Sequence, residues 1–427
     1  MSTIAKIELF HCKVPLPATF YPSWIPGFPS TYNMFTLLRV TTDDGVVGHS
    51  AGPAMGRERA GLGDILGPYL IGEDATDIPL IQQRCREMGY LGWRNFWVEA
   101  AFWDIKGKLA GKPVCELLGG KPCKIDLYAS TGEVKTGEQR IEEAQARYEE
   151  GFRSLKMRVH AFDEAEDIDQ VVKTAKVMAD KMKLGVDANQ GWRVTVIDDA
   201  PLWTLPRAKR FADVCADSGL DWVEEPLPMD DYDALSELTE YSRVPISGGE
   251  IHTSGLPELK MMIERRCYDI FQPDACFTGG IAQSMEVARL CKEHGLLYSP
   301  HTWTNGIGFA INMQLMAASG FVDKKALEYP INPPGWTVEA RDALLVKPWH
   351  HDRGTLTVPN APGLGFDIDP WALRRYGKRF FVMDKLRLVF FSLRHRGLKV
   401  SRELDAVKKA KKARRLLAAK SLDSAGS

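Results

Sequence analysis

Carboxylates close three successive apolar runs in the middle of the chain. Asp187, Glu224 and Glu250 each stand at the end of a short run of apolar or β-branched residues. Three hard oxygen ligands on neighbouring strand ends suit a magnesium-type ion that keeps open positions for substrate oxygens. The alternative is that each carboxylate only caps the helix that follows. Three of them in register favour a metal site, so we predict Mg²⁺ as the cofactor, with Glu225 either behind a ligand or sharing its role.

Titratable residues recur at the ends of the other runs as well. They follow one another at steps of 24 to 37 residues and are Lys156, Asp187, Glu224, Glu250, Asp274, His301 and Glu328. A step of about one strand and one helix puts each residue at a similar height, on the rim where barrel enzymes build their active sites. The spacing therefore predicts that these seven side chains converge on one mouth.

These groups could together remove a proton next to a carboxylate. A divalent ion that binds a substrate carboxylate stabilises the enediolate formed when the α-proton leaves. His301 has the form of the base, with Asp274 to orient its ring and raise its basicity. Lys156 and Arg158 alternate on one run and would face the mouth from the opposite side, where Lys156 can neutralise the substrate carboxylate.

The elements that must position these residues are eight short strands separated by helical stretches, which is the count of a (β/α) barrel. We place this barrel at residues 124–345. The predicted strands are Ile125–Ser130, Ser154–Val159, Lys183–Asn189, Trp222–Pro226, Pro245–Glu250, Ile270–Ala275, Leu297–Thr302 and Ala326–Tyr329.

Residues 1–123 read as a separate α+β capping domain. Alternation in Ile4–Leu16 and Phe35–His49 predicts an antiparallel meander, and residues 77–118 have a helical pattern. The aromatic, proline-rich segment Pro15–Tyr32 is predicted to be an irregular loop, either packed on itself or acting as a lid over the site. Residues 193–207 read as an insertion in the barrel.

The end of the chain is basic. Residues 346–375 are turn-rich and should lead back to the capping domain, and residues 376–427 are predicted to be a helical tail. From Arg374 to Ser427 there are 17 Lys or Arg against four acidic residues. Met383, Leu386, Val389, Phe390 and Leu393 would share one helical face. Docking on a neighbouring subunit or a solvated tail is favoured, and contact with an anionic membrane or nucleic acid stays open.

The whole chain is nearly neutral, with 55 basic and 56 acidic residues, so we expect no nucleic-acid partner for the chain as a whole. Eight cysteines without a CxxC pair indicate reduced thiols. With no recognisable leader at the N-terminus and no apolar run of membrane-spanning length, we expect a cytoplasmic protein.

The motifs carry a family resemblance. From the meander through Ala101-Phe102-Trp103-Asp104-Ile105-Lys106-Gly107 and Leu117-Leu118-Gly119-Gly120 to Pro362-Gly363-Leu364-Gly365, the chain resembles the mandelate racemase-like subgroup of the enolase superfamily. The resemblance implies a capping domain over a modified (β/α)7β barrel. It also places the family's metal ligands on Asp187, Glu224 and Glu250, its dyad on His301 and Asp274, and its substrate-carboxylate partner on Glu328.

One departure from the family pattern bears on the reaction. Lys156-Met157-Arg158 stands where many members have Lys-x-Lys, and arginine cannot serve as a base. We therefore expect a single-base syn dehydration of an aldonic or aldaric acid to a 2-keto-3-deoxy acid. A racemase or epimerase that uses Lys156 as second base is the alternative, followed by a silent sugar-acid binder.

The substrate is thus expected to be a small sugar acid, and the protein to assemble as a homo-oligomer, as family members usually do. Asn189, His252 and Trp303 are the further candidates for substrate contact, with packing roles as the alternative for His252 and Trp303.

Overall fold

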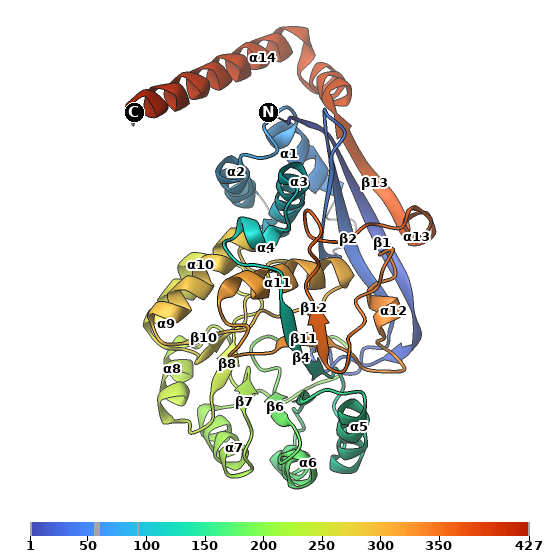
Figure 1. The fold of residues 1–427 in the computed structure, drawn as a ribbon, viewed down its shortest axis with the longest axis vertical. Helices are drawn as coiled ribbons and strands as arrows, with labels where there is room; N and C mark the ends of the chain where they lie inside the picture. The colour runs from blue at the N-terminus through green and yellow to red at the C-terminus, as the bar shows by residue number, and fades with distance from the viewer. Residues whose placement is uncertain (1, 55–59, 92–93, 426–427) are drawn as a thin grey trace.

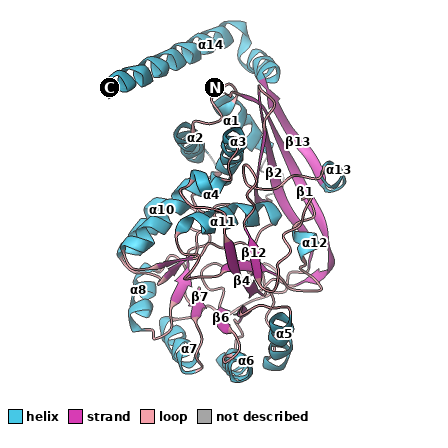
Figure 2. Ribbon diagram, viewed as in Figure 1, coloured by secondary structure: helices cyan, strands magenta, loops and turns pink. Residues whose placement is uncertain are grey.

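The fold consists of a barrel, a capping domain and a long C-terminal helix (Figure 1). It is taken from a computed structural model, which describes residues 2–54, 60–91 and 94–425. Figure 2 shows the strands of the barrel surrounded by helices and the long antiparallel sheet beside them.

The barrel is an all-parallel sheet with strand order β10-β9-β8-β7-β6-β5-β4-β11. Its strands are β4 (Lys124–Ser130), β5 (Ser154–Arg158), β6 (Lys183–Asp187), β7 (Trp222–Glu224), β8 (Ile246–Gly248), β9 (Ile270–Phe271), β10 (Leu297–Tyr298) and β11 (Leu327–Pro330). The helices between them are α5 (Gly137–Glu149), α6 (Glu164–Met178), α7 (Leu205–Asp217), α8 (Tyr232–Tyr241), α9 (Leu256–Glu264), α10 (Gly280–Glu293) and α11 (Gly306–Ser319). Seven helices between eight strands confirm the predicted (β/α)7β barrel.

Side chains close the barrel between its two end strands. Ser299 Oγ donates to the Ala326 carbonyl at 3.0 Å, and Thr302 Oγ1 donates to the Glu328 carbonyl at 2.9 Å. The antiparallel strand β12 (Thr355–Thr357) adds to β4 from outside. Because helices cover the strands, strand residues are buried on both faces, as in β5, where all five residues are buried.

The capping domain is a four-stranded antiparallel sheet with helices packed against it. The sheet has the order β13-β1-β2-β3, formed by β13 (Gly377–Asp384), β1 (Ile4–Phe20), β2 (Ser30–Thr42) and β3 (Val47–Pro53). Its helices are α1 (Ala60–Leu70), α2 (Ile78–Leu91), the 3-10 turn η2 (Phe96–Glu99), α3 (Ala100–Ala110) and α4 (Val114–Leu117). The short helices α12 (Val338–Arg341) and α13 (Pro370–Tyr376) lie on the return path from the barrel.

The segment Pro15–Tyr32 is more regular than predicted. Pairing of β1 with β2 continues through Pro15 opposite Tyr32 and resumes with Phe20 opposite Ser30, so the loop shrinks to residues 21–29. This shorter loop reaches the barrel, where the Ser23 amide donates to the Gly132 carbonyl at 2.9 Å. The hairpin is thus a long arm that carries its tip to the barrel mouth.

The prediction that a helical tail begins at residue 376 is wrong for its first part. Residues 377–384 form β13, which pairs with β1, and Met383 is buried in the capping core instead of on a helical face. Arg379 on β13 forms an ion pair with the buried Glu8 on β1 at 2.7 Å. Glycines at positions 63 and 67 of α1 leave room for Phe381 and Met383. Pairing with the edge of a sheet therefore overrides the local helical pattern.

The helix α14 (Lys385–Ala425) follows β13 and is kinked at Gly397, where φ is 76°.

All eight cysteines are free thiols, and seven of them are buried. None of the helices in the described part of the chain combines the length and apolar character that a bilayer-spanning segment requires.

Candidate active site

Three neighbouring strands bring two cations and two carboxylates to one rim. In the parallel register, Arg158 on β5 lies opposite Asp187 on β6, and Asp187 lies opposite Glu224 on β7. Lys156 stands two residues before Arg158 and therefore points to the same face of β5. All four side chains are buried, so their charges must be balanced inside the protein.

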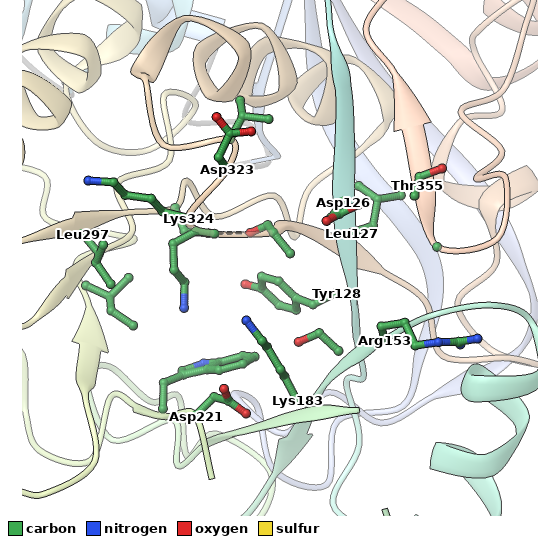
Figure 3. Close-up of a pocket in the computed structure, with 18 of the residues that line it drawn as sticks. Asp126, Leu127, Tyr128, Arg153, Lys183, Asp221, Leu297, Asp323, Lys324 and Thr355 are labelled. Carbon is green, nitrogen blue, oxygen red and sulfur yellow. Dashed lines mark hydrogen bonds between the residues drawn. The ribbon is translucent and has the colours of Figure 1, made fainter. Parts of the chain in front are cut away.

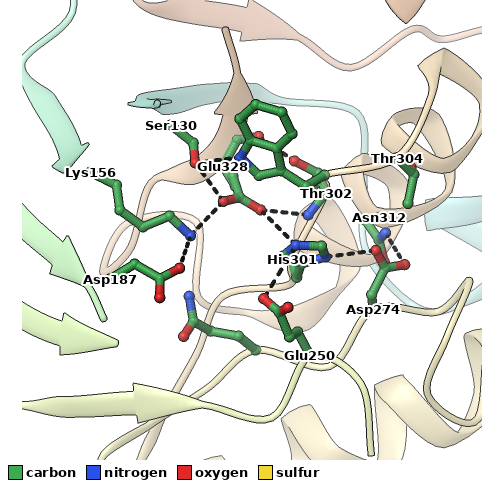
Figure 4. A network of polar contacts seen from close by, with 12 residues as sticks. Ser130, Lys156, Asp187, Glu250, Asp274, His301, Thr302, Thr304, Asn312 and Glu328 are labelled. Carbon is green, nitrogen blue, oxygen red and sulfur yellow. Dashed lines mark hydrogen bonds and ion pairs between the residues drawn. The ribbon is translucent and has the colours of Figure 1, made fainter. Parts of the chain in front are cut away.

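Lys156 is the centre of an ion-pair network (Figure 4). Its Nζ lies 2.5 Å from Glu224 Oε1, 2.7 Å from Glu328 Oε1 and 3.5 Å from Asp187 Oδ2. Burial by itself lowers the pKa of Lys156, but the carboxylates of Glu224 and Glu328 outweigh it and raise this pKa above its ordinary value. Arg158 pairs with Asp187 through Nη1. The side of the mouth formed by β5 therefore presents cations that hold their protons.

His301 stands on the other side of the mouth, in the loop after β10. Its Nδ1 lies 2.9 Å from Asp274 Oδ2, and its Nε2 lies 3.3 Å from Glu250 Oε2 and 3.8 Å from Glu328 Oε2. Burial lowers the pKa of His301, yet the surrounding carboxylates, led by Glu250, raise it to about 9. The structure therefore brings the predicted dyad together, with Nε2 facing the carboxylates of the mouth.

Asp274 is fixed by donors that the sequence reasoning did not identify. Its Oδ1 accepts hydrogen bonds from Asn312 Nδ2 and from the Cys276 amide, both at 2.8 Å. Asn312 lies in α11, and its own Oδ1 accepts from the Ala275 amide at 3.1 Å. The signal was an amide in a largely apolar helix that also carries Gln314, because a buried polar side chain needs partners.

Glu328 is held by two further groups, and one of them, Ser130, was not identified from the sequence. Ser130 Oγ donates to Glu328 Oε1 at 2.8 Å, and the Thr302 amide donates to Oε2 at 2.7 Å. Trp303 Nε1 in turn donates to Ser130 Oγ at 2.7 Å. Glu328 thus reaches both Lys156 and the neighbourhood of His301 from a fixed position.

The three predicted metal ligands also have second partners. Asp187 Oδ1 accepts from the Asn189 amide at 2.8 Å, Glu224 Oε2 accepts from Gln272 Nε2 at 2.9 Å, and Glu250 Oε1 accepts from Trp192 Nε1 at 2.7 Å. Such partners orient metal-binding carboxylates in proteins.

The donor set fits a divalent cation by its chemistry and charge. The buried carboxylates of this region outnumber the lysine and arginine among them; they are Asp187, Glu224, Glu225, Glu250, Asp274 and Glu328, against Lys156 and Arg158. Glu225 Oε2 has no hydrogen-bond partner, and burial, together with nearby Glu250 and Asp187, raises the pKa of Glu225 well above its ordinary value. In the part of the chain that the structure describes, no three His, Cys, Asp or Glu side chains are already arranged around one ion position. Lys156 and Arg158 instead balance part of the negative charge of these carboxylates.

Backbone strain marks the same rim. Asn189 and Glu225, just beyond β6 and β7, both have φ of 46°, a left-handed conformation that is unusual for a residue other than glycine. Asn189 Oδ1 accepts from Ser23 Oγ at 2.5 Å and from Arg158 Nη1 at 3.3 Å. The predicted mouth residue Asn189 therefore connects the loop of residues 21–29 to the site.

Aromatic side chains cover the mouth. The ring of Trp24 lies 5.0 Å from that of Trp303, and Phe20 stacks on Trp303 at 5.7 Å, between ring centroids. The Arg158 guanidinium lies 5.4 Å from the Trp24 ring centroid. The inserted segment takes part as well, because the Val194 amide donates to the Trp24 carbonyl at 3.2 Å. Trp303 is thus packed under the loop, next to the charged network.

His252 stands apart from this network. Its Nδ1 lies 2.9 Å from Glu258 Oε1, an oxygen that also accepts from the Tyr232 hydroxyl at 2.8 Å. Its buried Nε2 has no hydrogen-bond partner. The structure joins His252 to α8 and α9 instead of to the dyad, and its predicted substrate contact stays a prediction.

A cavity of about 410 Å³ lies at the opposite, N-terminal end of the barrel (Figure 3). Lys183, Lys325 and Arg153 line it, and its buried Tyr128 hydroxyl, Ser247 Oγ and Gln272 Oε1 have no hydrogen-bond partner. Only one layer of side chains separates it from the charged network, because the lining residue Gln272 also donates to Glu224.

Comparison with known proteins agrees with this architecture. Residues 21–119 match the profile of the mandelate racemase / muconate lactonizing enzyme N-terminal domain, and residues 139–372 match the enolase C-terminal domain-like profile. D-galactarolactone cycloisomerase of Agrobacterium fabrum is 29% identical over 358 residues, which are 80% of this chain and 90% of that protein. Arabinonate dehydratase of Saccharolobus solfataricus is 28% identical over 350 residues, 79% of this chain and 89% of the relative.

Solved structures have the same fold. A structure described as a putative racemase from Roseobacter denitrificans superposes with a TM-score of 0.73 at 26% identity, over 90% of this chain and 100% of that one. L-talarate dehydratase from Polaromonas sp. JS666, solved with Mg and L-glucarate, also gives 0.73, at 24% identity, over 90% of this chain and 100% of that one. With both domain profiles matched in order over the cap and the barrel, the chain belongs to the mandelate racemase/muconate lactonizing enzyme family of the enolase superfamily, as its motifs predicted.

Proposed function

We propose that this protein is a magnesium-dependent acid-sugar dehydratase that acts through one base, His301. The observation that carries the proposal is the asymmetry of the mouth. His301, oriented by Asp274 at 2.9 Å, stands on one side, and the ion-paired Lys156 and Arg158 stand on the other. An ion-paired ammonium group and a guanidinium group bind anions and do not remove protons.

The chain's residues would divide the reaction as follows. Mg²⁺, held by Asp187, Glu224 and Glu250, would supply positive charge next to the substrate carboxylate. His301 Nε2 takes the α-proton, and Asp274 stabilises the imidazolium that forms. The imidazolium then gives this proton to the β-hydroxyl. The carbon–oxygen bond breaks, water leaves, and the resulting enol becomes the 2-keto-3-deoxy acid.

On the opposite side, Lys156 and Arg158 would hold the substrate carboxylate and its neighbouring oxygen. Glu328 would fix Lys156, which it contacts at 2.7 Å. Anion binding of this kind positions the α-carbon in front of His301 and requires no second base on the opposite side.

The names of the relatives support a sugar acid as substrate. They include arabinonate, L-talarate/galactarate, D-mannonate and D-xylonate dehydratases at 27 to 29% identity. A second candidate is a cycloisomerase, which is favoured by the 29% identity to D-galactarolactone cycloisomerase over 90% of that protein. A cycloisomerase would share proton removal beside a carboxylate and would differ in the group that leaves.

The test is a substrate screen in deuterium oxide. Purified protein with MgCl₂ is incubated with a panel of aldonic acids, aldaric acids and aldarolactones, and the products are followed by ¹H NMR and as semicarbazones. We expect a 2-keto-3-deoxy product from one stereochemical group of acids. The same screen with His301→Asn should give no product, and the exposed-histidine variant His294→Asn is the matched control.

Other outcomes would select another function. Conversion of a lactone with no reaction of the free acids would favour the cycloisomerase. Deuterium at the α-carbon without keto product would favour an epimerase with Lys156 as second base. Saturable binding of an acid with neither product nor exchange would leave a sugar-acid binder.

A further inference from the structure

The helix α14 lies outside the part of the chain that matches the family profiles. The family profile ends at residue 372, before β13 and α14. Figure 1 shows α14 projecting from the end of β13, at the end of the molecule farthest from α6 and α7. Residues 385–402, which lie on both sides of the kink at Gly397, are called the basic segment below.

The basic segment has an exposed apolar face. Val389 and Phe390 stand three and four residues after Leu386, and Leu393 stands four and three residues after them, so these side chains share one face of the helix. They are 83%, 50%, 66% and 38% exposed. Contiguous large apolar side chains on an ordered helix are rare on soluble surfaces and mark an interaction site.

The opposite face of this helix is already occupied. Leu388 packs against the hydrophobic core of the capping domain. The Phe391 ring lies 4.5 Å from the His395 ring, and Ser392 Oγ lies 2.9 Å from Ser401 Oγ across the kink. The contact of Leu388 with the core orients this part of the helix, so the apolar face on the opposite side points away from the protein.

Cations surround the apolar face. The basic segment contains no Asp or Glu, and its lysines and arginines are Lys385, Arg387, Arg394, Arg396, Lys399 and Arg402. Arg387 pairs with Asp384 just outside the segment. The other five form no ion pair with any residue that the structure describes. Apolar and cationic groups therefore stand side by side on one surface.

We propose that the basic segment docks this protein on an anionic lipid surface. At a bilayer interface, the apolar face enters the headgroup region while the flanking lysines and arginines meet lipid phosphates. A second copy that packed by two-fold symmetry would bring the same cations against each other. Nucleic acid would take the cations but would leave Leu386 and Phe390 in water. The proposal is independent of the reaction at the barrel mouth.

The test is flotation of the full-length protein with vesicles. Phosphatidylcholine vesicles are compared with vesicles that also contain phosphatidylglycerol. We expect about a tenfold higher partition coefficient on the anionic vesicles and a steep loss in high salt. The double variant Leu386→Ser with Phe390→Ser should lose about tenfold in partitioning, with its thermal unfolding curve unchanged.

A matched control is available at the far end of the molecule. Val196 and Ile197 are 74% and 59% exposed in the loop before α7. The variant Val196→Ser with Ile197→Ser removes two exposed apolar side chains outside the basic segment, and it should float like the unchanged protein. The charge variant Arg394→Glu with Arg396→Glu should lose binding to anionic vesicles and not gain binding to neutral ones.

Three results would overturn the proposal. The first is equal flotation with neutral and anionic vesicles, or none with either. The second is a dimer in lipid-free sedimentation velocity that Leu386→Ser with Phe390→Ser converts to monomer, since a second copy would then cover the face. The third is binding to a DNA duplex that is tighter than binding to the anionic vesicles.

Discussion

The two ends of the barrel differ in almost every physical respect. The C-terminal end is filled with buried charges in contact with one another and is covered by Trp24 and Trp303. The N-terminal end holds an open cavity of about 410 Å³ whose hydroxyls at Tyr128 and Ser247 have no partner. This cavity thus lies away from the groups that could do chemistry. The proposed site therefore rests on the mutual contact of buried ionisable groups and not on cavity volume.

The two ends are also connected. Gln272 and Trp222 line the cavity, and both donate to Glu224 Oε2, at 2.9 Å and 3.3 Å. Glu224 is therefore supported from the side that carries no proposed chemistry. Substitutions at the C-terminal end should change turnover strongly, and those at the N-terminal end should change stability or nothing.

The largest effect is expected from His301→Asn. Loss of the proposed base should lower kcat by about 10³-fold, because general acid–base catalysis supplies roughly 10² to 10⁴. Steady-state kinetics on the substrate found in the screen measures it, with His294→Asn as control. Full turnover by His301→Asn would remove the single-base mechanism.

Glu250→Gln tests the metal assignment. Replacing a charged ligand by a neutral amide should weaken Mg²⁺ binding by about 10²-fold, because hard cations prefer carboxylate oxygen. Isothermal titration with MgCl₂ measures this directly, and activity after chelation and Mg²⁺ addition measures it functionally. Glu258→Gln, whose carboxylate contacts His252 instead of the network, is the matched control. An unchanged affinity in Glu250→Gln would show that the ligands lie elsewhere.

A smaller effect should follow from Asn312→Ala. Asn312 acts through Asp274, to which it donates at 2.8 Å, so it is a positioning residue. We expect kcat to fall roughly 10- to 100-fold, as for other groups that orient a catalytic side chain. The Mg²⁺ affinity should stay unchanged, which separates this effect from that of Glu250→Gln. Asn312→Asp keeps the shape but adds a charge beside Asp274, and a recovery of activity there would argue against the donor role.

The sequence predicted the strands better than their ends. Each predicted strand overlaps an observed one, because buried parallel strands are short apolar runs between helices. Several ended too late: β6 stops at Asp187 and β8 at Gly248, so Glu250 stands in a loop. In the turns after β6 and β7, Asn189 and Glu225 have a left-handed backbone conformation, and no sequence pattern predicts that conformation for a glutamate. Contacts across the mouth fix it.

Other features depended on partners far away along the chain. Residues 377–384 contain four consecutive apolar residues, a short run that fits a helix or a strand, and pairing with β1, at the other end of the sequence, decides for a strand. Ser130 and Asn312 became visible only once Glu328 and Asp274 had been placed beside them. Residue types thus identified the charged groups, and tertiary pairing identified the groups that hold them.

Trp24→Ala tests the cover of the C-terminal end. Trp24 touches Trp303 and Arg158, and an aromatic contact of this kind contributes about 1 kcal/mol. Its loss should weaken the closed loop and raise KM about fivefold, with a smaller change in kcat. Trp371→Ala is the matched control, because Trp371 is exposed on α13. An unchanged KM would mean that the loop of residues 21–29 takes no part in substrate binding.

The smallest effect on turnover is expected at the N-terminal end, from Lys325→Met. Lys325 lines the cavity and lies over the Trp222 ring at 5.0 Å, at the barrel end opposite to His301, so kcat should stay within about twofold. Burial lowers the pKa of Lys325 to about 8, against the partly opposing effect of Asp221. Between this pKa and the ordinary value of a lysine, the unfolded chain binds more protons at this residue than the folded one. The contribution of Lys325 to stability therefore increases as pH rises through this window.

Unfolding in urea at pH 7 and pH 10 should show that the unchanged protein gains stability relative to Lys325→Met at the higher pH. A difference that is constant with pH would mean that Lys325 stays charged in the cavity, and a large loss of kcat would mean that the two ends of the barrel are coupled through Glu224.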